Sequence, residues 1–139
     1  MKVSRTKGRA LRKFAAAILV GLLFAVGPGT GSGLAQGVVT FKVTNNAPYI
    51  VMLKMFSQAR RGWVWPSPTT HFILSDSTER AARLACEVGE KICFGASYSP
   101  DDTPRHWGVG IKGDKVCTDC CLICGPLDQD VSASFSLVE

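Results

Sequence analysis

The stretch DVSASFSLV, residues 130–138, alternates polar and apolar side chains more regularly than any other part of the sequence. Its apolar positions fall at every second residue, and they are Val131, Ala133, Phe135 and Leu137. Successive side chains of a β-strand point to opposite faces of the sheet. This pattern therefore predicts a strand with one face in a core and the other in solvent.

A second alternating stretch, VVTFKVT at residues 38–44, shows the same period of two near the start of the chain. Further short runs are rich in β-branched, aromatic or apolar residues and are separated by Asn, Pro, Gly and Asp. These runs lie at residues 49–57, 71–74, 91–99 and 107–111. Six or seven short strands of this kind predict an all-β fold, a small antiparallel β-sandwich or barrel. We expect residues 77–85 to be extended too, despite their helix propensity.

The alternations also predict which side chains form the core. We expect the last strand to pair near the first, because each would then cover a polar backbone edge of the other. The side chains expected to be largely buried are Val39, Phe41, Val43, Ile50, Met52, Phe94, Val109, Ile111, Phe135 and Leu137.

The N-terminal segment has the parts of a secretory signal peptide. A basic stretch is followed by an apolar run of 13 residues, FAAAILVGLLFAV at 14–26, and then by the small-residue stretch GPGTGSGLAQ at 27–36. A membrane anchor needs about 20 apolar residues, so we do not expect one in the mature chain. We expect a signal peptide at 1–35 with cleavage after Ala35, a single domain at 36–139, and a secreted or periplasmic protein.

The net charge of +5 belongs to this segment. Six of the sixteen basic residues lie in the first thirteen positions, which hold no acidic residue. The rest of the chain has ten basic residues against eleven acidic ones. The basic balance therefore gives no support to nucleic-acid binding.

All six cysteines lie in the expected mature domain: Cys86, Cys93, Cys117, Cys120, Cys121 and Cys124. An even number of cysteines in a short exported chain predicts a disulfide framework. We expect at least one bridge from Cys86 or Cys93 to the cluster at 117–124, since Cys120 and Cys121 are adjacent and need different partners. Two alternatives use the CxxCCxxC segment itself, as a zinc site or as a redox-active dithiol.

The opening of the domain resembles that of thaumatin-like proteins, which begin with the pattern F-x-[IV]-x-N-x-C-x-x-x-V. Phe41, Val43, Asn45 and Val51 occupy matching positions, whereas Ala47 stands where that family has a cysteine. The resemblance implies a related β-sandwich, of glycan-facing type. It implies no site residue, because the acidic cleft of that family has no counterpart here.

No catalytic motif stands out in the sequence. The two histidines, His71 and His106, have no carboxylate at metal-ligand spacing, and no nucleophile motif is present. The neighbours Asp101 and Asp102 are expected to lie in a solvated turn rather than in a glycosidase cleft. We therefore expect a protein that is not an enzyme and that needs no cofactor or metal.

Aromatic residues give the one candidate binding site. Trp63 and Trp65 lie two positions apart, so both rings would face the same way on an extended chain, beside Arg60 and Arg61. Such rings stack on sugars or anchor a protein partner, and the alternative is that they cover one end of the core. We expect a monomeric binding or structural domain for a glycan or an envelope protein, with a small hydrolase or inhibitor as the alternative.

Overall fold

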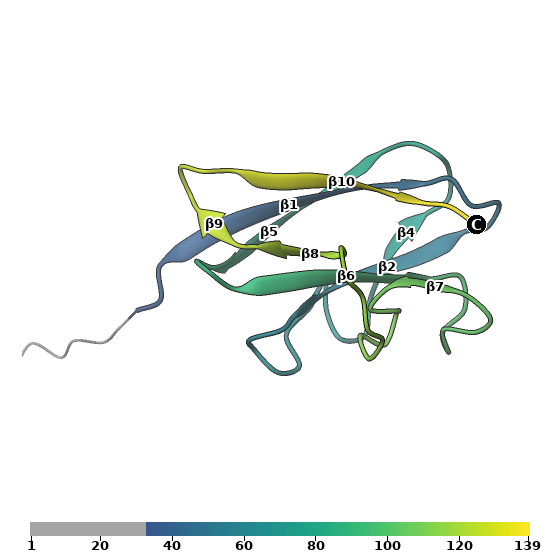
Figure 1. Ribbon diagram of the computed structural model, residues 1–139, viewed down its shortest axis with the longest axis horizontal. Helices are drawn as coiled ribbons and strands as arrows, with labels where there is room; N and C mark the ends of the chain where they lie inside the picture. The colour runs from purple at the N-terminus through teal and green to yellow at the C-terminus, as the bar shows by residue number, and fades with distance from the viewer. Residues whose placement is uncertain (1–32) are drawn as a thin grey trace, which may run out of the picture. The chain divides into compact units, whose positions relative to one another are not determined.

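The computed structural model describes residues 33–139, which fold into two β-sheets without a helix. Sheet A has the strand order β10-β1-β5, with β9 also paired to β1, and sheet B has the order β3-β2-β6-β7, with β4 paired to β2 and β8 to β6 (Figure 1). The strands of sheet A are β1 (Gln36–Asn45), β5 (Arg80–Glu87), β9 (Gly125–Pro126) and β10 (Val131–Leu137). Those of sheet B are β2 (Val51–Ser57), β3 (Val64–Trp65), β4 (Phe72–Leu74), β6 (Lys91–Ser97), β7 (His106–Gly108) and β8 (Cys121–Ile123).

The expected all-β sandwich is confirmed, and so is the extended conformation of the segment that forms β5. The signal peptide predicted at 1–35 lies almost wholly outside the described residues. Its last residue, Ala35, is described, and its carbonyl accepts a hydrogen bond of 2.9 Å from the N–H of Val88. In the described part of the chain, no helix is long and apolar enough to cross a membrane.

Strand β1 is the centre of sheet A. It pairs antiparallel with β5 along one edge, from Gln36 to Val43, while β9 and then β10 occupy its other edge. Val39, Phe41 and Val43 are fully buried, as their alternation predicts. A strand this deeply buried needs partners on both edges, because its backbone N–H and C=O groups cannot bond to water.

The last strand does pair with the first, but in parallel orientation. The register joins Val39 to Val131 and Asn45 to Leu137, so both strands run the same way. The chain first passes β1 antiparallel as β9, then reverses in a turn in which the N–H of Gln129 donates to the carbonyl of Pro126 at 3.0 Å. This reversal on a single edge makes sheet A mixed, whereas every pairing in sheet B is antiparallel.

Strand β2 presents the opposite face to the core from the one expected. Val51, Leu53 and Met55 are buried, whereas Met52 is only half-buried and Ile50 is 61% exposed. The side chains of residues 50, 52 and 54 point to the same face of the strand. One of them is Lys54, whose ammonium needs water or a polar partner. It donates to the carbonyl of Pro68 at 2.7 Å. Lys54 therefore turns this face of the strand outward.

The remaining expected core residues are buried with one exception. Phe94 and Leu137 are buried in strands, and Val109 and Ile111 are buried in a turn that follows β7 rather than in the expected strand. Phe135 is half-buried, with its ring centroid 5.7 Å from that of Phe41 and 4.8 Å from that of Phe94. Both sheets contribute to one hydrophobic core.

The side chain of Asn45 ties the two sheets together at the end of β1. Its amide donates to the carbonyls of Tyr49 and Leu74, at 2.6 and 2.9 Å, and its Oδ1 accepts from the N–H of Ala47 at 3.0 Å. Leu74 belongs to β4 of sheet B, and Asn45 is almost completely buried. One buried amide thus satisfies three backbone groups at the point where the chain crosses between sheets.

Three disulfide bonds join the cysteines: Cys86–Cys124, Cys93–Cys121 and Cys117–Cys120. The expected long-range bridge is confirmed, and there are two of them. Cys93 and Cys121 lie opposite each other on β6 and β8. The N–H of Phe94 donates to the carbonyl of Cys120 at 2.9 Å, so these cysteines form the narrow, non-hydrogen-bonded type of antiparallel pair.

We predict that the three bridges contribute unequally to stability. The Cys86–Cys124 bridge spans 38 positions and the Cys117–Cys120 bridge only 3, so the chain-entropy model assigns them about 4 and about 2 kcal/mol. Urea denaturation of the double variants Cys86→Ala/Cys124→Ala and Cys117→Ala/Cys120→Ala measures both losses. Equal losses would contradict the prediction.

Candidate functional site

The loop between β2 and β3 carries Arg60, Arg61 and Trp63, and Ser57 shapes it. The hydroxyl of Ser57 accepts hydrogen bonds from the N–H groups of Ala59 and Arg60, at 3.2 and 2.8 Å. The N–H of Ser57 donates to the carbonyl of Trp63 at 3.0 Å. These bonds close a tight loop and fix where the two side chains of Arg60 and Trp63 begin.

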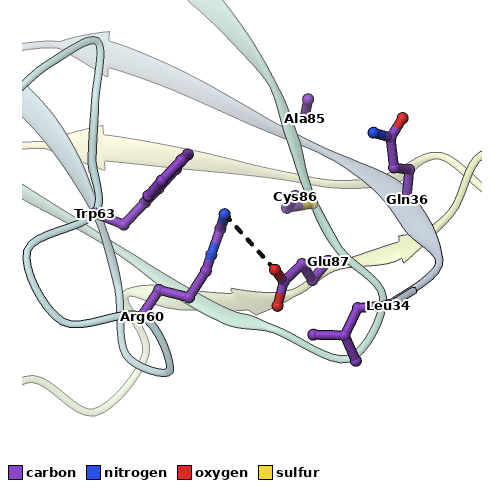
Figure 2. A pocket seen from close by; sticks show the side chains of 7 residues that line it. All are labelled: Leu34, Gln36, Arg60, Trp63, Ala85, Cys86 and Glu87. Atoms are coloured by element: carbon purple, nitrogen blue, oxygen red, sulfur yellow. Dashed lines mark ion pairs between the residues drawn. The ribbon is translucent and has the colours of Figure 1, made fainter. Parts of the chain in front are cut away.

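The guanidinium of Arg60 forms a bidentate ion pair with Glu90. Nε and Nη2 of Arg60 donate to Oε1 and Oε2 of Glu90, each at 2.8 Å. The Glu90 side chain is 1% exposed and that of Arg60 is 25% exposed. The N–H of Glu87 also donates to Oε2 of Glu90, at 2.9 Å, and the Glu87 carboxylate lies 3.9 Å from Nη1 of Arg60 (Figure 2). Paired charges at this depth hold Arg60 in one position.

Glu90 is ionised in the fold despite its burial. Burial alone would raise its pKa, but hydrogen bonds from Arg60, from the Glu87 N–H and from Ser57 outweigh that effect. The pKa of Glu90 therefore lies below its ordinary value of 4.5.

Both tryptophan rings lie against this fixed guanidinium. Its central carbon is 4.1 Å from the centroid of the Trp63 ring and 5.7 Å from that of Trp65. The two rings therefore share one cation. Trp65 is half-buried and packs against the core, whereas Trp63 is 52% exposed. The interpretation as a core cover thus fits Trp65, and the interpretation as a contact surface fits Trp63.

Trp63 lines hollows on more than one side. One hollow of about 270 Å³ lies between the loop and β5, with Arg60 and Glu87 facing each other inside it (Figure 2). A larger hollow of about 470 Å³ is lined by Phe56, Ser57, Gln58, Ala59, Arg61, Gly62, Trp63, Val64, Lys112 and Gly113. A third hollow, of about 310 Å³, reaches from Trp63 to the proline-rich segment at 66–68.

The larger hollow adds residues that the sequence pattern does not single out. Lys112 lies 51 positions after Arg61, and the fold brings both cations to the same hollow, which has no carboxylate among its lining residues. Gln58 and Ser57 contribute polar groups there. Arg60 and Arg61, adjacent in sequence, have separate roles: the first is paired with Glu90, and the second is exposed and forms no ion pair within residues 33–139.

Among residues 33–139, the carboxylates and histidines singled out in the sequence lie in different settings. Asp102, expected in solvent, is buried, and its carboxylate accepts hydrogen bonds from the N–H groups of Ile111 and Lys112, at 2.6 and 3.3 Å. These bonds hold the buried turn that follows β7, so Asp102 has a structural task. Asp101 stays exposed, and its pKa falls to about 2 because Ser99 and Thr103 donate hydrogen bonds to it. His71 and His106 are exposed.

The sulfur atoms form a second notable cluster. The Sγ atoms of Cys93, Cys117, Cys120 and Cys121 all lie within 4.8 Å of one another. The CxxCCxxC segment predicts Cys124 as the fourth member, but the fold pairs Cys124 with Cys86 and brings Cys93 to the group instead.

No family model, curated protein or solved structure matches this chain. The resemblance to thaumatin-like proteins rests on residues 41–51 and stays an expectation from the sequence. What the structure establishes is a class: a small, all-β domain of two packed sheets cross-linked by three disulfides.

We predict that Arg60 and Arg61 differ sharply in their effect on stability. Arg60→Met leaves the Glu90 carboxylate buried without its cation, which costs about 3 kcal/mol. Arg61→Met changes only an exposed side chain and stays within about 0.5 kcal/mol of the wild type. Urea denaturation at neutral pH measures both values, and similar effects of the two variants would contradict the ion-pair assignment.

We predict a specific pH dependence for the Glu90→Gln variant. Because the pKa of Glu90 is lowered in the fold, its ion pair stabilises the protein above pH 4.5, and this stabilisation is lost as the pH falls through the folded value. The difference in unfolding free energy between wild type and Glu90→Gln is therefore largest near pH 7 and shrinks in acid. A difference that stays constant between neutral and acidic pH would show that the carboxylate charge has no such role.

Proposed function

We propose that this chain is an exported, non-enzymatic binding domain that holds a glycan against Trp63. The proposal rests on how the Trp63 side chain is held. Its ring lies against the immobilised guanidinium of Arg60, and about half of its surface is exposed. This exposed part lines the hollows of about 470 and 310 Å³. A ring fixed before the ligand arrives loses little conformational entropy on binding, so more of the stacking energy appears as affinity.

The lining of the larger hollow supports a sugar rather than an apolar ligand. Apart from Trp63, Phe56 and Val64, its residues are small, polar or cationic. Sugars offer an apolar ring face for stacking together with a rim of hydroxyls for hydrogen bonding. With Arg61 and Lys112 present and no carboxylate in the lining, the preferred glycan carries negative charge, as in a uronic acid.

Three disulfide bonds support the exported location in this proposal. Such bonds persist in secreted or periplasmic proteins and are rare in a reducing cytosol. The basic and apolar N-terminal segment has the order of a signal peptide, which supports the same assignment.

Glycan-array screening followed by calorimetry tests the proposal with uronic-acid oligosaccharides and neutral oligosaccharides of the same length. We expect binding that favours the acidic series, and Trp63→Ala should weaken it at least about tenfold, or 1.4 kcal/mol. Tyr49→Ala is the matched control, since Tyr49 is also an exposed aromatic residue but lines none of the hollows around Trp63. Absence of glycan binding, or equal affinity of the Trp63→Ala variant, would contradict the proposal.

A further inference from the structure

The four clustered sulfurs come from two segments, β6 and residues 117–121, which are joined by backbone hydrogen bonds as well as by a disulfide. Cys93 lies in β6 and Cys121 in β8, and these strands also pair through Lys91 with Ile123 and Ile92 with Leu122. The N–H of Phe94 bonds to the carbonyl of Cys120, which fixes the loop end next to the ladder. Cys93, Cys120 and Cys121 are therefore positioned by backbone pairing as well as by covalent bonds, and Cys117 is held to the group by its bridge to Cys120.

Two of the unbonded sulfur–sulfur distances match those of a tetrahedral metal site. A Zn²⁺ ion bound by four thiolates has Zn–S distances of about 2.3 Å, which places neighbouring sulfurs about 3.8 Å apart. The Sγ of Cys121 lies 3.7 Å from that of Cys120 and 3.9 Å from that of Cys117, although no bond joins these pairs. All four sulfurs lie within 4.8 Å of one another. The pairs Cys93–Cys121 and Cys117–Cys120 are disulfide-bonded, so both bonds must be reduced and their sulfurs must separate before four thiolates can surround an ion.

The two bridges of the cluster are less buried than the third bridge, so they are more accessible to a reductant. Each has one buried and one half-buried cysteine: Cys93 with Cys121, and Cys120 with Cys117. In the Cys86–Cys124 bridge both residues are buried. Exchange needs access to a sulfur atom, so a reductant reaches the cluster first.

We propose that reduction of Cys93–Cys121 and Cys117–Cys120 converts this cluster into a four-thiolate site for Zn²⁺. Each bridge takes up two electrons and two protons from a dithiol donor, which is left as its own disulfide, and the four thiols lose their protons when the ion binds. The protein thus has an oxidised form with two bridges and a reduced form with one Zn²⁺ at the same four residues. This site is independent of the glycan site around Trp63.

The purified oxidised protein tests the order of reduction. It is treated with increasing phosphine, a reductant that brings no competing thiol, and free cysteines are trapped and mapped by mass spectrometry. We expect the four cluster cysteines to be labelled before Cys86 and Cys124. Earlier labelling of Cys86 and Cys124 would overturn this part of the proposal.

Zinc binding is then measured on the reduced protein by competition with a chromophoric chelator. We expect one Zn²⁺ per chain, and Co²⁺ in its place should give the absorption of a tetrahedral thiolate site. Cys93→Ala and Cys117→Ser should each weaken binding by more than about 100-fold, since loss of a ligand exceeds the loss of an outer-shell partner. The control Cys86→Ser/Cys124→Ser keeps all four ligands and should bind Zn²⁺ like reduced wild type.

The competing ligand set, Cys117, Cys120, Cys121 and Cys124, gives the opposite pattern. It predicts full affinity for Cys93→Ala and a large loss for Cys86→Ser/Cys124→Ser, and that result would overturn the proposal. Circular dichroism keeps the test decisive if reduction unfolds the chain. In that case one equivalent of Zn²⁺ must restore the β spectrum, and a chain that stays unfolded with Zn²⁺ would refute the site.

Discussion

The Cys86–Cys124 bridge passes beside β1 at Gly37, and this close passage constrains the whole of sheet A. In the sheet, Cys86 is the partner of Gly37 on one side, and Gly125, which follows Cys124, is the partner of Val38 on the other. A Cβ on Gly37 would come 2.7 Å from the Sγ of Cys124 and would collide with the carbonyl oxygen of Gly125. Only glycine fits here, so the bridge, the glycine and the strand order depend on one another.

The same bridge positions the ion pair that supports Trp63. The carbonyl of Cys124 accepts a hydrogen bond from the N–H of Gly89 at 2.9 Å, and its N–H donates to the carbonyl of Glu90 at 2.8 Å. The turn that carries Glu90 is therefore held by the bridged segment, and Glu90 in turn holds Arg60 beneath the Trp63 ring. The Cys86–Cys124 bridge thus helps to position the exposed Trp63 ring, through the turn that carries Glu90 and the ion pair between Glu90 and Arg60.

Periodicity in the sequence predicts elements better than partners. The alternation around Phe41 and Phe135 identifies both strands and their buried faces, but nothing local distinguishes parallel from antiparallel pairing. The sequence does contain a signal for the outward face of β2, because the charged Lys54 lies on the same face as Ile50 and Met52. When a strand has apolar residues on both faces, its one charged residue decides which face is exposed to solvent.

The candidate site shows the same division. Tryptophans two positions apart and the arginines beside them are visible in the sequence, and they do meet in the fold. Which arginine is fixed depends on Glu90, 30 positions away, and the second cation of the larger hollow, Lys112, comes from the turn after β7. The burial of Asp102 escapes a local pattern because its task is to bind backbone N–H groups nine and ten positions later. Contacts over such separations follow from topology.

The pairing of β1 with β10 also determines when this domain can fold. The two strands lie at opposite ends of the domain, and even the side-chain bond from Thr40 to Asp130 spans 90 positions. Closing so long a loop costs entropy that no local contact offsets, and contacts of this kind form slowly. The ribosome releases β1 well before β10, so most of one edge of the most buried strand has no partner until β10 has been synthesised. Sheet A therefore closes late, and a ribosome-bound chain that stops before β10 leaves the apolar face of β1 without its last neighbour.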